Sequence, residues 1–226
     1  ISKKSFCFHP HGSLDPFDIN KKKRFFKNLI GYFIYRNIFN YSSGIIFTSL
    51  LESKKSKIFG SSVNKYIANL TSPVKTDNSK LAPNIITKIK KKYEIQEGKK
   101  ILLFLSRIDE KKGLDILLKS LSILNQNKRS TILLIAGVGS KKYMRYIIDL
   151  IKKLKLTRDI RLLGHISGNQ KSDIIKISDL FVLPTLNENF GIAIVEALQN
   201  NLPVLITKDV YIYKDIINEK GGFLCS

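Results

Sequence analysis

The sequence predicts an α/β protein built around a doubly wound parallel sheet. From residue 98 onward, short apolar runs of strand length alternate with segments whose apolar residues recur three and four positions apart, as in a helix. Such alternation is typical of a parallel sheet with helices on both faces. The chain has 226 residues, of which 43% are hydrophobic and 25% charged, so it has room for one large domain or parts of two.

The elements of this region follow in order along the chain. Strands are expected at residues 101–105, 132–136, 160–163, 180–183, 203–206 and 222–225. Helices are expected over the periodic segments 114–124, 147–151, 174–177 and 192–198. A helix thus separates most neighbouring strands, which is the connection that parallel strands need.

Residues 1–70 form a different predicted unit, which is too small to close a domain. Its expected elements are strands at 5–8 and 44–48, an aromatic-rich helix at 21–40 and a second helix that begins near Ser49. Glu52 lies three residues after Ser49, and a capping box is a sufficient explanation of this pair. The polar stretch 69–83 contains two prolines and is the expected linker, so residues 71–226 form the second unit.

The formal net charge of +21 allows three interpretations. The lysines are scattered through helices and loops beside abundant Ile and Asn, so we attribute them first to biased coding composition. A basic surface for anionic membranes or acidic substrates is the alternative. A nucleic-acid site would need clustered cations and is not expected.

No metal site is expected, because the sequence has neither an Asp-x-Asp triplet nor a His/Cys cluster with metal spacing. Cys7 and Cys225 lie in predicted strands at opposite ends and are expected to be buried free thiols. Free thiols are typical of a reducing compartment. The expected location is the cytoplasm, with the inner face of the membrane as an additional place of contact.

The most informative motif is a strand-to-helix turn bracketed by Glu188 and Glu196. Glu188 follows the apolar strand 180–183 and should lie at its carboxyl end, where open α/β sheets bind ligands. Glu196 belongs to a helix that carries Ile192, Val195 and Leu198 on one face, and helical side chains lean toward the amino terminus. Both carboxylates can therefore reach the same crevice.

This turn resembles the glutamate-seven-residues-glutamate motif of retaining GT-B glycosyltransferases, the group 1 or family 4 enzymes. The resemblance implies that Glu188 contacts the donor sugar and that Glu196 binds the nucleotide ribose. The intervening turn, with Asn189, Phe190 and Gly191, would lie at the sugar and phosphate, where helix-start amides suit an anion. Two solvated acids on a helix would explain the glutamates alone, but not the Phe-Gly pair after an apolar strand.

A basic loop follows the strand at 101–105 and opens the next helix. A diphosphate can meet helix-start amides and cations together at such a place. In the family that the chain resembles, an arginine and a lysine directly before a glycine bind the donor diphosphate. Arg107 and Lys112 match these positions, and Lys111 is a poorer match. A solvated basic turn is the structural alternative.

Near the start, a Pro-His-Gly segment follows a strand, and its histidine is His11. The family often carries such a histidine facing the transferred sugar, so the resemblance makes His11 a catalytic candidate; a histidine that only satisfies loop carbonyls is the alternative. Gly139 lies in a glycine turn that would suit a phosphate or the donor, although a tight turn explains it equally well. His165 and Ile166 lie in a segment that resembles the one that the family places at the nucleotide base, and His165 is expected to be a loop residue rather than a catalyst.

The resemblance spans nearly the whole chain and implies a GT-B fold, with a nucleotide-sugar domain at 71–226 and part of an acceptor-side Rossmann-like domain at 1–70. It implies an enzyme that moves a hexose from a nucleoside-diphosphate sugar to a glycan or lipid-linked acceptor with retention and without a cofactor. Because the chain lacks an initial Met and its last predicted strand ends at Ser226, we expect an inactive fragment. The alternatives are a basic nucleic-acid- or membrane-binding protein and a GT-B phosphorylase or pseudoenzyme.

Overall fold

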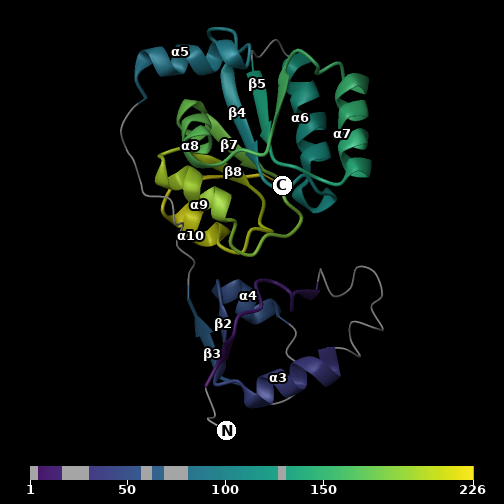
Figure 1. Ribbon diagram of the computed structural model, residues 1–226, viewed down its shortest axis with the longest axis vertical. Helices are drawn as coiled ribbons and strands as arrows, with labels where there is room; N and C mark the ends of the chain where they lie inside the picture. The colour runs from purple at the N-terminus through teal and green to yellow at the C-terminus, as the bar shows by residue number, and fades with distance from the viewer. Residues whose placement is uncertain (1–4, 17–30, 57–62, 69–80, 127–130, 226) are drawn as a thin grey trace. The chain divides into compact units, whose positions relative to one another are not determined.

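The computed structural model describes residues 5–16, 31–56, 63–68, 81–126 and 131–225 (Figure 1). The chain divides into two compact units. The first unit comprises residues 1–71 together with Asn187–Phe190, and the second unit comprises 72–186 and 191–226.

The second unit contains a parallel sheet of six strands in the order β6-β5-β4-β7-β8-β9. These strands are β4 (Lys100–Leu105), β5 (Thr131–Ala136), β6 (Ile160–Gly164), β7 (Leu180–Leu183), β8 (Val204–Ile206) and β9 (Gly222–Leu224). The chain order runs outward in one direction from β4 to β6 and in the other from β7 to β9. The predicted doubly wound parallel sheet is therefore confirmed, and its switch point lies between β4 and β7.

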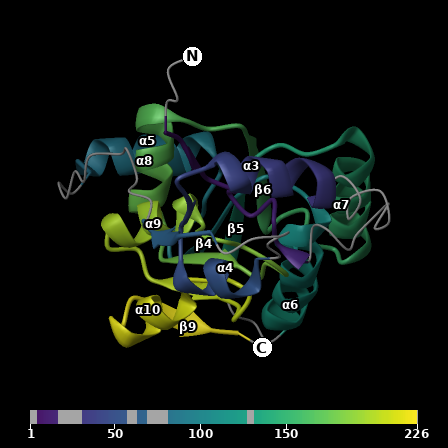
Figure 2. The ribbon, with the colours of Figure 1, turned by 90° about the horizontal axis from the view of Figure 1, so that it is seen from below.

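Helices cover both faces of this sheet. They are α5 (Pro83–Lys92), α6 (Leu114–Gln126), α7 (Lys141–Lys153), α8 (Gly168–Ile177), α9 (Ile192–Gln199) and α10 (Tyr213–Asn218). α6 and α7 lie on one face, and α8, α9 and α10 lie on the other (Figures 1 and 2). The reversal of the winding direction at the switch point places the two sets on opposite faces, because parallel crossovers are right-handed.

Apolar side chains from the strands and from α6 form the core of the second unit. Every residue of β5 is buried, and α6 presents Leu114, Leu118 and Leu121 to the sheet, each at most 1% exposed. Each such side chain contributes about 1.5–3 kcal/mol by leaving water. The predicted leucine periodicity of this helix is thus confirmed as its buried face.

The predicted helix after Gly191 is present as α9, and its buried face is not the one that carries Ile192, Val195 and Leu198. Ile192 is 45% exposed, and the buried residues of the helix are Ile194, Glu196 and Ala197. The left-handed residue Gly191 caps the helix, and the direction in which the chain leaves this cap turns Ile194 and Ala197 inward. Apolar spacing alone allowed either face, because α9 is apolar around most of its circumference.

Two further expectations need correction. Cys7 is exposed and Cys225 is only partly buried, so the prediction of two buried thiols is wrong. Both lie at the margins of short strands, where few neighbours cover them. The helix α5 was not predicted either: it begins at Pro83, the proline expected at the end of the linker.

The first unit contains a parallel sheet in the order β1-β2-β3. Its elements are β1 (Cys7–Phe8), a π-helical turn η1 (Gly31–Tyr35), α3 (Arg36–Tyr41), β2 (Gly44–Phe47), α4 (Leu50–Lys55) and β3 (Lys65–Ile67). A small core of Leu14, Phe39, Ile45 and Phe47 holds them together. Of the predicted helix 21–40, residues 31–40 are helical and the rest lie outside the described residues, as does most of the predicted linker.

Among the helices that the structure describes, none combines the length and apolar character of a membrane-spanning segment.

Candidate functional site

The carboxyl edge of the second unit's sheet gathers several of the predicted site residues. Loops that leave β4, β5 and β6 carry, in this order, Arg107 with Lys112, then Gly139, then His165 with Ile166. Open parallel sheets bind ligands at this edge, close to the switch point. These predicted site residues therefore lie in loops at the same edge of the sheet.

The two cations of the loop after β4 differ in their exposure to solvent. Arg107 is exposed, whereas Lys112 is only 6% exposed at the end of a short 3-10 helix, η2 (Glu110–Lys112). The Asp109 side chain caps this helix by accepting a hydrogen bond from the Lys111 amide at 2.9 Å. Gly113 then ends it in the left-handed conformation, with φ at 67°.

Backbone contacts bind this loop to the segment after β7. The Lys111 carbonyl accepts hydrogen bonds from the Thr185 hydroxyl at 3.0 Å and the Leu186 amide at 2.8 Å. A Cβ at Gly113 would overlap the Pro184 carbonyl oxygen, so only glycine fits there. The basic loop and the strand end that precedes Glu188 are therefore held together, although they are more than seventy positions apart in the sequence.

The glycine turn after β5 is explained by close packing. A Cβ at Gly137 would overlap the Ser106 carbonyl oxygen, and one at Gly139 would overlap the Ile108 carbonyl oxygen. Gly139 forms an isolated parallel bridge with Ile108. The role of Gly139 in donor binding stays a prediction, because backbone approach alone requires glycine here.

The predicted base segment after β6 contains one exposed and one buried residue. His165 is exposed, and Ile166 is 5% exposed. The segment is joined to the turn after β5 by a hydrogen bond from the Gly137 amide to the Gly164 carbonyl at 2.7 Å. This arrangement leaves the imidazole accessible to a ligand at the carboxyl edge.

Glu196 lies in the second turn of α9 and is 4% exposed. Its Oε1 accepts a hydrogen bond from Nζ of Lys171, at 2.6 Å, in a salt bridge between α9 and α8. The sequence analysis missed Lys171, because the two residues are 25 positions apart and no helical or strand spacing links them. Glu196 is thus a buried ion-pair member rather than a solvated acid.

In the first unit, His11 occupies a strained turn. It is exposed, and its φ of 46° is unusual for a residue other than glycine. Its ring stacks on that of His9, with centroids 3.8 Å apart. Partial burial and the neighbouring His11 lower the pKa of His9 below its usual value, against the opposing effect of the Glu52 carboxylate.

A fully buried carboxylate, that of Glu52, organises this turn. It accepts hydrogen bonds from the Gly12 amide at 2.8 Å, the Thr48 amide at 2.7 Å and the Thr48 hydroxyl at 2.6 Å. Ser49 does cap α4, since its hydroxyl accepts from the Glu52 amide at 3.1 Å. Capping is nevertheless not a sufficient explanation of Glu52, because its carboxylate turns toward Thr48 and the His11 turn.

The segment Asn187–Phe190 belongs to this first unit. Its Asn189 side chain donates to Glu52 Oε1 at 3.3 Å, and a Cβ at Gly12 would overlap the Asn189 amide group. Its Asn187 side chain donates to Asp15 at 3.3 Å. Glu188 is partly buried and Phe190 is 8% exposed. The predicted sugar-contacting turn thus packs against the segment that carries His11.

A metal-binding cluster is not found in the described ranges, where no three His, Cys, Asp or Glu side chains are placed to share an ion. The expectation that catalysis needs no metal stays a prediction.

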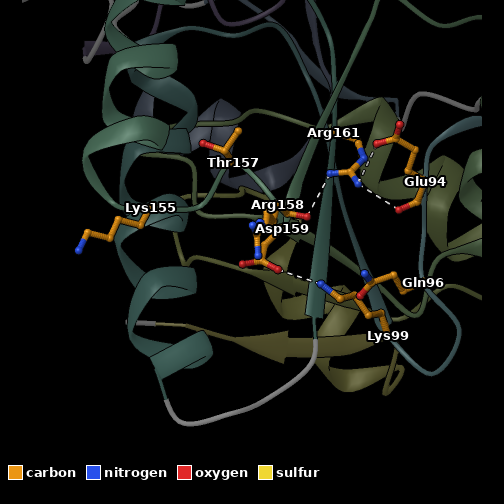
Figure 3. A pocket seen from close by; sticks show the side chains of 8 residues that line it. All are labelled: Glu94, Gln96, Lys99, Lys155, Thr157, Arg158, Asp159 and Arg161. Carbon is orange, nitrogen blue, oxygen red and sulfur yellow. Dashed lines mark hydrogen bonds and ion pairs between the residues drawn. The ribbon is translucent and has the colours of Figure 1, made fainter.

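A cavity of about 470 Å³ lies at the opposite, amino-terminal edge of the second unit's sheet (Figure 3). Arg161 donates to the carbonyls of Tyr93, Glu94 and Arg158 there, and Lys99 forms a 2.9 Å salt bridge with Asp159. These contacts tie the segment before β4 to the start of β6. We therefore assign Arg161 and Lys99 a structural role, since their donors are engaged within the protein.

Comparison with known proteins shows the family to which this chain belongs. Residues 85–226 match the family described as glycosyl transferases group 1, and this match covers more than half of the chain. The chain therefore belongs to the group 1 glycosyltransferases, as its motifs predicted.

Individual relatives agree with this assignment. An uncharacterized glycosyltransferase of Methanocaldococcus jannaschii is 27% identical over 128 residues, which are 57% of this chain and 32% of that protein. The phosphatidyl-myo-inositol mannosyltransferase of Mycobacterium leprae is 30% identical over 122 residues, covering 53% of this chain and 31% of that protein. The chain thus spans about a third of the length of these curated relatives.

Solved structures show the same GT-B fold. HepE of Anabaena, crystallised with UDP and glucose, has a TM-score of 0.77 at 17% identity, covering 99% of this chain and 58% of that one. WaaG, a glycosyltransferase involved in lipopolysaccharide biosynthesis, has a TM-score of 0.73 at 19% identity, covering 96% and 60%. The predicted GT-B architecture is therefore confirmed.

Proposed function

We propose that this chain binds a nucleoside-diphosphate hexose and is part of a retaining hexosyltransferase. The acceptor class that we propose is a glycan or a lipid-linked acceptor of polysaccharide biosynthesis. HepE, which was crystallised with UDP-glucose, and the mannosyltransferase of Mycobacterium leprae support the donor class and a lipid acceptor respectively. Because the chain spans only part of its relatives, the activity of the whole protein is part of this proposal.

In the proposed reaction, the bond between the anomeric carbon and the diphosphate oxygen breaks, and an acceptor oxygen bonds to the same face of that carbon. The departing nucleoside diphosphate takes the electron pair of the broken bond and accepts the proton that the acceptor hydroxyl loses. Arg107 and Lys112 stabilise the negative charge that develops on the departing diphosphate. Removal of one such group from a preorganised site typically lowers the rate about 100- to 1,000-fold.

The two glutamates and His11 have separate proposed roles. Glu188 orients the donor sugar, and Glu196 accepts hydrogen bonds from the ribose. His11, exposed on its turn, faces the transferred sugar. Asn189, Phe190 and Gly191 line the donor between the glutamates, and no metal ion takes part.

One observation carries the proposal: the basic loop after β4 and the segment that leads to Glu188 are fastened to each other through the Lys111 carbonyl and the close approach of Gly113 to Pro184. The loop that carries the proposed diphosphate cations is therefore held to the strand end from which the chain continues to Glu188.

Calorimetry with matched ligands tests the assignment. UDP, GDP and ADP, and the glucose derivative of whichever binds, are titrated into the chain. Glu188→Gln should leave the affinity for the nucleoside diphosphate nearly intact and remove the additional affinity that the sugar supplies. Glu196→Ala should weaken both ligands by roughly 1.5–3 kcal/mol, the usual value of a hydrogen bond to a charged group.

The result that contradicts the proposal is the reverse pattern, or the absence of binding to all three nucleotides by a folded sample. Salt-sensitive binding to polyanions that free nucleotide sugar does not displace would favour a basic binding protein instead. For the full-length enzyme, proton NMR of the first product decides between retention and inversion of the anomeric configuration. Turnover that depends on inorganic phosphate would indicate a phosphorylase.

A further inference from the structure

A salt bridge between α8 and α9 connects two parts of the carboxyl edge. Lys171 is the fourth residue of α8, and Glu196 lies in the second turn of α9. The side chain of Glu196 is 6% exposed and that of Lys171 is 23% exposed, with 2.6 Å between Nζ and Oε1. The pair is therefore shielded from water on the carboxylate side and open on the lysine side.

Shielding makes the partner of this carboxylate important. Removing an ionised carboxylate from water is costly unless a counter-charge and hydrogen-bond donors replace the lost solvent. In the part of the chain that the structure describes, Lys171 supplies this counter-charge. The salt bridge thus fixes the position of one of the two oxygens of Glu196.

A lysine is suited to hold a carboxylate that must also bind a ligand. An ionised carboxylate offers about four lone-pair sites, and the ammonium group makes a single-point contact with one oxygen. An arginine would occupy both oxygens with its planar fork. Lys171 therefore leaves acceptor capacity on Glu196, which two adjacent hydroxyl groups could use.

The position of α8 connects this pair to the nucleotide. The helix begins at Gly168, directly after the segment of His165 and Ile166 that is predicted to meet the base. The proposed function puts the base on that segment and the ribose at Glu196. Lys171 is thus on the helix that continues from the base segment, and its partner is on the helix assigned to the ribose.

We propose that Lys171 is a positioning residue for Glu196 and that, through it, the chain recognises the ribose diol of a nucleoside diphosphate. This inference rests on the proposed function, because that function assigns Glu196 to the ribose. Lys171 itself need not touch the ligand: it orients the carboxylate and supplies the positive charge beside it.

The test pairs a change in the protein with a change in the ligand. The affinity of the full chain for UDP, GDP and ADP is measured by calorimetry, and then that for the 2′-deoxy and 3′-deoxy forms of the nucleotide that binds. The wild-type chain should prefer the ribonucleotide by about tenfold or more, since one hydrogen bond to a charged acceptor is lost in each analogue. Lys171→Met should weaken the ribonucleotide and reduce this preference to within about threefold.

Controls separate positioning from folding. Lys153→Met removes an exposed lysine at the far end of α7 and should change neither affinity nor preference. Lys171→Gln retains a hydrogen-bond donor but removes the positive charge. This variant supplies the same comparison if the methionine variant fails to fold. In a Glu196→Gln background, Lys171→Met should have little further effect on affinity, because its action passes through Glu196.

Three results would overturn the inference. If Lys171 variants weakened ribo- and deoxyribonucleotides equally, Lys171 would be only structural, while the proposed donor site would stand. If the wild-type chain bound a nucleotide without preferring the ribose form, the role of Glu196 would also be wrong. If it bound no nucleoside diphosphate, the proposed function would fail together with the inference.

Discussion

Gly113→Ala should destabilise the second unit more than its backbone angle alone requires. Gly113 has φ at 67°, a region that costs an L-residue about 1–2 kcal/mol. Its new Cβ would also overlap the Pro184 carbonyl oxygen, which must then move. That movement displaces Thr185 and Leu186 from the Lys111 carbonyl and forfeits two hydrogen bonds of about 1 kcal/mol each. The expected loss is therefore about 3–4 kcal/mol.

Gly98→Ala is the matched control. Its φ of 78° lies in the same region, but no atom of the described residues lies within 4 Å of the position of its Cβ. It should cost only the backbone term of about 1–2 kcal/mol, less a few tenths gained from the stiffer unfolded chain. Urea unfolding of both variants, followed by circular dichroism, measures the difference. Equal destabilisation would refute the argument that loop contact at Pro184 requires glycine.

Three further predictions concern the site. Lys112→Met should weaken nucleoside diphosphate binding about tenfold or more, whereas Lys111→Met should have a much smaller effect. Calorimetry of the two variants decides which lysine contacts the diphosphate. EDTA should leave transfer by the full-length enzyme unchanged; loss of activity that Mn²⁺ restores would show that the donor site has been misassigned. Glu52→Gln should destabilise the first unit by roughly 2–3 kcal/mol, because the new amide nitrogen would face either the Gly12 amide or the Thr48 donors. An unfolding free energy equal to that of the wild type would contradict this.

Most of the sheet in the second unit could be predicted from the sequence. β7 was placed to the residue, and the other predicted strands of this sheet differ by one residue at an end. Buried parallel strands are continuous apolar runs, so their signal is local and strong. By contrast, the face of α9 depends on how the chain leaves the Gly191 cap, which apolar spacing does not specify.

The candidate site was predicted through loop motifs, and its supporting residues were not. Arg107 and Lys112 were named as candidates because they match the arginine and lysine that the family carries in a loop between a strand and a helix. Lys171 and the carboxylate role of Glu52 escaped prediction, because each depends on a contact between segments that are distant in the sequence. Buried charges of this kind carry no periodicity, and only the folded chain brings their partners together.

The chain holds its carboxyl edge together with backbone atoms, which has a consequence for chemistry. Gly113 meets the carbonyl of Pro184, while Gly137 and Gly139 meet the carbonyls of Ser106 and Ile108. The loops after β4, β5 and β7 thus meet at glycines, where no side chain separates their backbones. In the proposed function, this close backbone packing holds the cations of the loop after β4 in fixed positions for the diphosphate. Electrostatic stabilisation of a departing diphosphate requires this combination, because charges that must first reorganise lose much of their effect.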